Sequence, residues 1–126
     1  MSFPELPADV RRFILTSIPS VPYLEAVLLL RGEPEKSWDA AQLARRLYVP
    51  ERNGVELIGL LKSSGIAEAV GDTSAVRYAP TAELGELLDR VAQAYASDLV
   101  AVTDLIHSRI DRRAQQFADA FRFRKE

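Results

Sequence analysis

The chain has 126 residues, of which 48% are hydrophobic and 27% are charged, and its formal net charge at pH 7 is −2. This length fits one compact domain with its own core, and the balance of apolar and charged residues excludes a disordered chain. The sequence contains no cysteine and one histidine, which excludes disulfide frameworks, thiolate zinc sites and a two-histidine metal site.

Sequence motifs for catalysis and cofactor binding are absent. The chain has no glycine-rich phosphate loop, no nucleophile elbow and no cluster with metal-ligand spacing. Carboxylate pairs such as Glu83 and Glu86 lack the accompanying bases that acid–base catalysis needs, and we interpret them as a solvated face. We therefore expect a protein that is not an enzyme and that needs no cofactor or metal.

Membrane and targeting signals are also missing from the sequence. The first residues, MSFPELPADVRR, have acids and prolines where a signal peptide has a basic end and an apolar stretch. The longest apolar patch, residues 26–30, is far shorter than the roughly 20 residues of a membrane-spanning helix. We expect a cytoplasmic protein without membrane association.

The first part of the chain predicts two helices. After Pro7, apolar residues recur at helical spacing, and Ser20 is a suitable N-cap for a second helix at about 21–31. The second helix is apolar on nearly all sides, so we expect it to be central and buried. The apolar residues of the first helix are Val10, Phe13, Ile14 and Ile18.

Two more helices are predicted close together, at about 38–47 and 50–64. Ser37 is the expected cap of the first, and Pro50 is well placed to open the second because proline fits the first helical turn. A glycine at position 65 ends the pair.

A β-hairpin is predicted directly after these helices. Two short runs rich in valine, isoleucine and tyrosine, 66–70 and 75–79, are joined by the turn-forming sequence Gly71-Asp72-Thr73-Ser74. The apolar period thus changes from helical to alternating after residue 65.

The stretch SWDAAQLARRLYVPERNGVELIGLLKSSGIAEAV resembles a winged helix-turn-helix domain of bacterial transcription regulators, and the resemblance covers about residues 10–80. It implies a mainly α fold with a small β-hairpin, and it implies that the helix at about 50–64 is a recognition helix. We expect residues 1–80 to form the winged-helix domain and residues 81–126 a C-terminal helical extension of the same compact unit. The residues that carry the resemblance are Ala41, Leu43, Ala44, Leu57, Leu61, Ser64, Gly65, Ile66 and Tyr78.

A winged helix-turn-helix domain implies double-stranded DNA as a partner. Arginine pairs with guanine and asparagine with adenine in the major groove, so Arg52 and Asn53 on the outward face of the recognition helix are the predicted base-reading pair. Acidic residues on the same helix, Glu51 and Glu56, weaken the attraction to phosphates. The cations expected on phosphates are Arg45, Arg46, Lys62 and Arg77.

A second function stays open beside DNA binding. Gly59 and Leu60 lie on or near the nominal recognition face, and an exposed leucine there suits a partner protein better than phosphates. The alternative hypothesis is therefore a winged-helix module for protein–protein interaction that does not bind DNA.

One long helix is predicted from residue 81 to about 107, with a broad apolar stripe on one side. The stripe predicts a homodimer in which two copies pack against each other, and packing against the N-terminal helices of the same chain is the alternative. In a dimer, Asp98 would need a basic partner such as Arg109 or Arg112 of the second copy. The predicted dimer residues are Leu84, Leu88, Val91, Tyr95, Val102 and Leu105.

Charge follows the same division of the chain. Residues 81–107 carry five acidic residues against Arg90 alone, whereas residues 108–126 carry six basic residues against three acidic ones. An acidic helix followed by a basic tail is consistent with a nucleic-acid contact, with a solvated helix end, or with a contact between two copies, which would then be arranged antiparallel.

Overall fold

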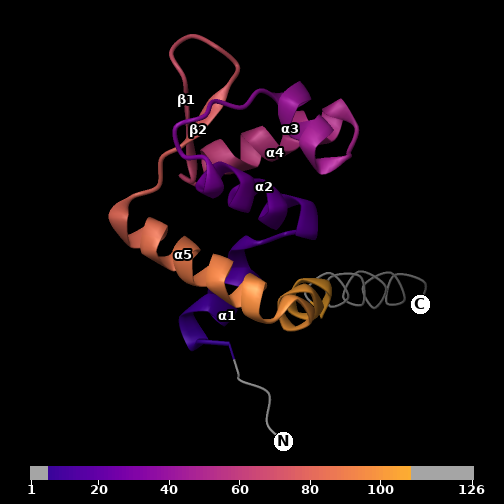
Figure 1. Cartoon of the computed structure of the whole chain (residues 1–126), viewed down its shortest axis with the longest axis vertical. Coiled ribbons are helices and arrows are strands. Elements are labelled where there is room, and N and C mark those ends of the chain that lie inside the picture. The colour runs from indigo at the N-terminus through magenta and orange to yellow at the C-terminus, as the bar shows by residue number, and fades with distance from the viewer. Residues whose placement is uncertain (1–5, 109–126) are drawn as a thin grey trace, which may run out of the picture. The chain divides into compact units, whose positions relative to one another are not determined.

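The computed structural model describes residues 6–108 (Figure 1). A mainly helical chain with one small hairpin agrees with the fold class predicted from the sequence. All of the basic tail except Ser108 lies outside the described residues, and so does a short last helix that the sequence predicts at about 111–121. In chain order the elements are α1 (Ala8–Ser17), α2 (Val21–Gly32), α3 (Ala40–Leu47), α4 (Glu51–Ser63), β1 (Ala67–Ala69), β2 (Val76–Tyr78), α5 (Ala82–Ser97) and a final helix, Leu99–Ser108.

The chain divides into two compact units. One is Pro22–Asp89, which holds α2, α3, α4, the hairpin and the first half of α5. The other is Met1–Val21 together with Arg90–Glu126, whose described part holds α1, the second half of α5 and the final helix. That residues 1–80 fold as a domain stays a prediction.

Helix α2 supplies much of the core of the Pro22–Asp89 unit, as its apolar sequence predicts. Leu24, Val27 and Leu30 are fully buried, and burying large aliphatic side chains contributes about 1.5–3 kcal/mol each. The hydroxyl groups of Tyr23 and Ser64 lie 2.9 Å apart in a hydrogen bond, which ties α2 to the end of α4.

The start of α3 differs from the prediction. The helix begins at Ala40, and its cap is Asp39 rather than Ser37. The Asp39 carboxylate accepts a hydrogen bond from the Gln42 backbone N–H at 2.8 Å, and the Gln42 side chain accepts from the Asp39 N–H at 3.0 Å. This reciprocal pair satisfies two N–H groups that a helix start leaves without partners, so it fixes the first turn.

Trp38 is part of the sheet region and not of α3, which corrects the predicted helix start at residue 38. Its backbone N–H donates to the Val76 carbonyl oxygen at 2.8 Å, and the Val76 N–H donates to the Trp38 oxygen at 2.9 Å. The Trp38 side chain is 2% exposed, so the segment before α3 is anchored against β2 by backbone pairing and by a buried indole.

Helices α3 and α4 pack very closely, and Gly54 permits the contact. A Cβ atom on Gly54 would overlap the Ala40 carbonyl oxygen and would lie 3.2 Å from the Ala44 Cβ. Only a residue without a side chain can therefore occupy this position at the observed helix spacing. The helix-turn-helix pair depends on this contact.

The hairpin follows α4 as predicted. Strands β1 and β2 pair antiparallel, with Glu68 opposite Arg77 and Ala69 opposite Val76. Gly65 and Gly71 have positive φ angles of 78° and 57°, at the entry to the hairpin and in its loop, where other residues would be strained.

The long helical stretch after the hairpin is interrupted at Asp98, which corrects the expected unbroken helix to about residue 107. Helix α5 ends at Ser97, and the Asp98 carboxylate accepts a hydrogen bond from the Ala101 N–H at 3.0 Å. Aspartate at this position acts as the N-cap of the final helix. The carboxylate thus has a partner in its own chain, and it does not depend on an arginine from a second copy.

Among residues 6–108, no single helix is both long and apolar enough to cross a membrane. Helices α1 and α2 reach that length and hydropathy only together, as a pair bent by 117°.

Candidate nucleic-acid interface

Helix α4 presents two chemically distinct faces. Leu57, Ile58 and Leu61 are buried together with Gly54, as expected for the inner face. Arg52 and Asn53, in the first turn of α4, are both exposed, in agreement with the prediction that they point outward. The remaining exposed residues of this outer face are Glu56, Gly59 and Ser63.

The cations around the turn between α3 and α4 are exposed and unpaired. Arg45 and Arg46 lie in the last turn of α3, and Arg52 lies in the first turn of α4. None of the three takes part in the ion pairs of the described residues, which join Arg31 to Asp89, Arg77 to Glu68 and Arg90 to Asp9. Their charges are therefore available to an anionic partner.

Lys62 is exposed as well, but it lies apart from this group. It stands ten positions after Arg52 on α4, which corresponds to about 15 Å along the helix axis. The structure thus brings Arg45, Arg46, Arg52 and Asn53 into one short segment and leaves Lys62 at the other end of the helix.

Arg77 is the predicted phosphate contact with the least free charge. Its guanidinium lies 3.3 Å from the Glu68 carboxylate on the paired strand, and both side chains are about half exposed. Asp72 in the hairpin loop adds a further negative charge. The wing therefore offers little net attraction to phosphates.

Lys36 is a cation near the wing that sequence reasoning missed. Its ammonium group lies 4.0 Å from the centre of the Trp38 ring, in a cation–π contact. The sequence indicated this contact only through the position of Lys36, two residues before the single tryptophan.

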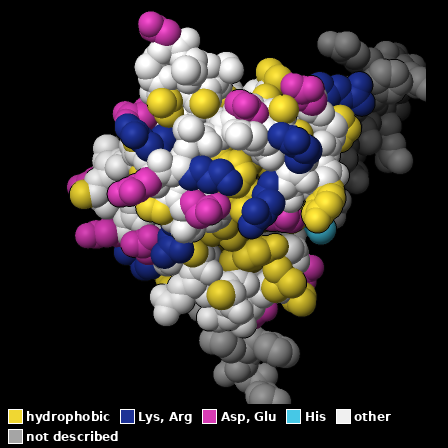
Figure 2. All heavy atoms as spheres, turned by 45° about the horizontal axis from the view of Figure 1, so that its top comes forward, with side chains coloured by type: hydrophobic (Ala, Val, Ile, Leu, Met, Phe, Trp, Pro, Cys, Tyr) yellow, Lys and Arg dark blue, Asp and Glu magenta, His cyan; other side chains and the backbone are white. Residues whose placement is uncertain are grey.

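Large hydrophobic side chains are exposed on the same segment as the cations. Tyr48 is 95% exposed, Val55 60% and Leu60 44%. Of these, the sequence analysis singled out Leu60 alone. Figure 2 shows a face on which basic side chains are interspersed with acidic and hydrophobic ones, so charge on this face does not form one uniform patch.

The apolar stripe predicted to form a dimer is largely covered by the chain itself. Leu88, Val91 and Val102 have no exposed surface in the single chain. This burial favours the alternative, packing within one chain, and the role of these residues in a dimer stays a prediction. Leu84, Tyr95 and Leu105 are half-buried, whereas Leu99 and Val100 are 52% and 65% exposed.

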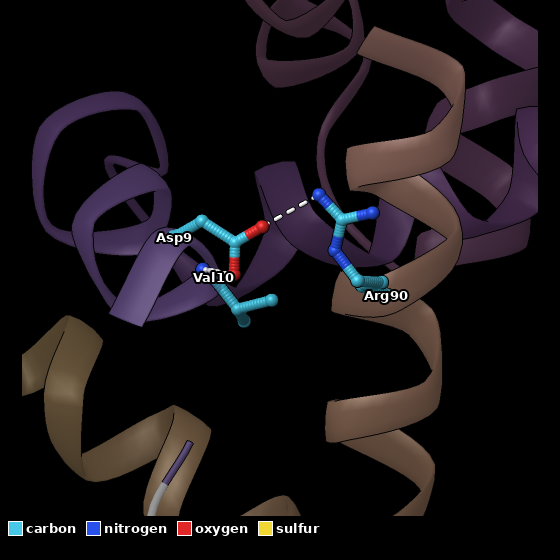
Figure 3. A network of polar contacts seen from close by, with 3 residues as sticks. All are labelled: Asp9, Val10 and Arg90. Atoms are coloured by element: carbon cyan, nitrogen blue, oxygen red, sulfur yellow. Dashed lines mark hydrogen bonds and ion pairs between the residues drawn. The ribbon is translucent and has the colours of Figure 1, made fainter. Parts of the chain in front are cut away.

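In the unit that contains α1 and the second half of α5, an ion pair joins these two helices (Figure 3). The Arg90 guanidinium donates to the Asp9 carboxylate at 2.5 Å, and this hydrogen bond is the main cause that lowers the pKa of Asp9. The Asp9 carboxylate also accepts from the Val10 N–H at 2.9 Å. A pocket of about 230 Å³ beside Arg90 is lined mainly by apolar atoms of residues such as Pro7 and Ala94.

Metal-binding geometry does not occur within residues 6–108, where no three His, Cys, Asp or Glu side chains come together.

Comparison with known proteins identifies the fold. No family model matches the chain, and no curated protein matches its sequence. A solved structure of a MarR family protein from Bacillus stearothermophilus is similar over 86% of this chain and 82% of that chain, with 20% identity and a TM-score of 0.50. A crystal structure of a Mycobacterium tuberculosis protein aligns over 86% of this chain and 69% of that chain, with 20% identity and a TM-score of 0.45.

The class that these observations define is the winged helix-turn-helix fold. It rests on the α3–α4 pair, the hairpin that follows, and the likeness to the Bacillus stearothermophilus structure. At 20% identity that likeness concerns the fold alone.

Proposed function

We propose that the protein is a DNA-binding winged-helix regulator without enzymatic activity. Helix α4 enters the major groove with its first turn leading, and Arg52 and Asn53 face the base edges. Arg45 and Arg46 contact the phosphates at the edge of the groove. The observation that carries the proposal is that the exposed, unpaired side chains Arg45, Arg46, Arg52 and Asn53 gather at the α3–α4 turn.

The electrostatic part of binding is expected to be modest. Each phosphate contact contributes about −0.9 to the slope of log K against log salt, so the contacts of Arg45 and Arg46 give a slope of about −1.8 for each chain. Glu51 and Glu56 oppose this attraction, and Arg77 is held by Glu68. Specific contacts by Arg52 and Asn53 must therefore supply much of the discrimination between sequences.

The proposal includes a homodimer, because two copies double the phosphate contacts and read two half-sites. Since Leu88, Val91 and Val102 are buried within the chain, the proposed contact surface is centred on the exposed Leu99 and Val100. A regulator of this kind acts where the DNA lies, so the proposal also places the protein in the cytoplasm.

The test is selection of a binding sequence followed by affinity measurement. The intact protein is mixed with random duplexes and with the DNA upstream of its own gene, and bound sequences are recovered. Fluorescence anisotropy between 50 and about 200 mM salt then measures the slope expected from the phosphate contacts. Arg12→Ala, an exposed arginine of α1, is the matched control. If no duplex binds better than a scrambled one, the proposal is wrong.

A second function has one specific observation in its favour. Val55 and Leu60 expose apolar surface on α4, which suits a groove of a partner protein. If the protein binds no DNA, Val55→Asp should abolish a protein complex recovered by crosslinking, whereas Arg52→Ala should leave it intact.

A further inference from the structure

Tyr48 has an unusual backbone conformation. With φ 59° and ψ 43° it adopts the left-handed region, and it is the only non-glycine residue within 6–108 with a positive φ. It caps the end of α3, where its N–H donates to the carbonyl oxygens of Ala44 and Arg45. Glycine and asparagine are the usual residues at such a cap, because bulky side chains are strained there.

The fold gains nothing from the tyrosine side chain at this position. It is 95% exposed, so almost no packing offsets the strain of the backbone. By contrast, Tyr23 is buried and hydrogen-bonded to Ser64. Strained residues that the fold does not need are found preferentially at functional sites.

The surroundings of Tyr48 favour an anionic partner. Arg45 and Arg46 precede it by three and two positions, Arg52 follows by four, and all three are exposed and unpaired. Glu51 is the one acidic residue among them. When the first turn of a recognition helix leads into the major groove, the turn before it lies at the groove edge, where the phosphates are.

We propose that Tyr48 is a DNA-backbone contact whose hydroxyl group donates a hydrogen bond to a phosphate oxygen. This contact fixes the register in which Arg52 and Asn53 meet the bases, because phosphate contacts position a protein on the duplex. The inference rests on the proposed DNA-binding function and assigns a role to a residue that the sequence analysis passed over. A contact with a partner protein is the competing outcome.

Two variants separate the side chain from the backbone strain. Tyr48→Asn keeps a residue that tolerates the cap conformation, so its melting temperature should rise by about 2–4 °C. Its affinity for the selected duplex and for a scrambled duplex should fall by the same factor, about tenfold, because phosphate contacts are independent of sequence. Tyr48→Phe retains the ring and loses only the hydroxyl, and its affinity should fall about fivefold.

A duplex with single neutral methylphosphonates locates the contact. Wild-type protein should lose affinity when one particular phosphate outside the base-reading positions is neutralised. Tyr48→Phe should be insensitive to that substitution, because the hydrogen bond is already missing. Arg12→Ala, which keeps Tyr48, should respond to the neutral phosphate as wild-type protein does.

The outcomes distinguish the two proposals. If the wild-type protein binds no DNA, the proposed function fails and the inference fails with it. If the wild-type protein binds DNA and both Tyr48 variants bind it with wild-type affinity, the inference fails and the proposed function stands. The inference also fails if the Tyr48 variants lose a complex with a partner protein while their DNA affinity is unchanged. A lower melting temperature for Tyr48→Asn would contradict the backbone strain at this position.

Discussion

Gly54 of α4 lies so close to Ala40 of α3 that a Cβ atom at position 54 would overlap the Ala40 carbonyl oxygen. Two helices of a helix-turn-helix pair can approach to this distance only where one of them has a glycine at the point of contact. The angle at which α4 presents Arg52 and Asn53 therefore depends on a glycine on the opposite face of the same helix.

Gly54→Ala is expected to destabilise the protein by about 1–3 kcal/mol, because the added methyl group forces the two helices apart. Gly59→Ala is the matched control, since a Cβ there meets nothing within 4 Å. That variant should gain about 0.5–1 kcal/mol from the better helix propensity of alanine. Urea unfolding measures both, and equal stability of the Gly54→Ala and wild-type proteins would contradict the close approach.

The cap of α3 offers a test that separates two neighbouring candidates. Asp39→Ala removes the carboxylate that accepts from the Gln42 N–H, and it should cost about 0.5–2 kcal/mol of stability. Ser37→Ala should leave the melting temperature unchanged, because Asp39 rather than Ser37 caps the helix. Thermal unfolding measures both variants. If Ser37→Ala lowered the melting temperature more than Asp39→Ala did, Ser37 would be the cap, as the sequence predicted.

Arg52 and Arg77 should differ in their effect on DNA affinity. Arg52→Ala is expected to cost about 1–3 kcal/mol on the selected duplex and to relax the preference at one base pair. Arg77→Ala should cost less than about 1 kcal/mol and act alike on all sequences, since Glu68 already holds the guanidinium in an exposed pair. Anisotropy titrations with both duplexes measure this, and equal losses from both variants would contradict it.

Asp9 should titrate below the ordinary aspartate pKa of about 3.9, because Arg90 hydrogen-bonds to its charged form. A carboxyl group whose pKa is lower in the folded than in the unfolded protein stabilises the folded state at pH values above its unfolded-state pKa. That contribution is lost as the pH falls through the folded pKa. NMR titration of the Asp9 carboxyl in wild-type and Arg90→Gln proteins checks this. The pKa should rise in the variant, and an unchanged pKa would contradict the assignment.

The proposed homodimer can be tested at its exposed residues, Leu99 and Val100, and at the buried Val91. Val91→Lys buries a charge in the core of the single chain and should cause unfolding, whatever the oligomeric state. Leu99→Lys combined with Val100→Lys should instead convert a dimer into a folded monomer, because both side chains are more than half exposed. Light scattering combined with circular dichroism separates these results. A monomeric wild-type protein at micromolar concentration would refute the proposed dimer.

Local sequence determined most of the secondary structure. The apolar periodicity predicted α2 as a buried helix, and the change of period after Gly65 predicted the hairpin. These features follow from spacing and turn chemistry, which act over a few residues. The outward position of Arg52 and Asn53 followed in the same way, because the buried leucines of α4 define its opposite face.

Tertiary structure decided the features that depend on distant parts of the chain. The backbone pairing of Trp38 with Val76 and the close approach of Gly54 to Ala40 join segments that periodicity treats separately. The apolar stripe of α5 predicted that Leu88 and Val91 are buried, but it did not predict which surface covers them. An amphipathic helix fits a second copy or its own domain equally well, because hydrophobic burial has no direction of its own. Only the three-dimensional packing determines which surface covers such a stripe.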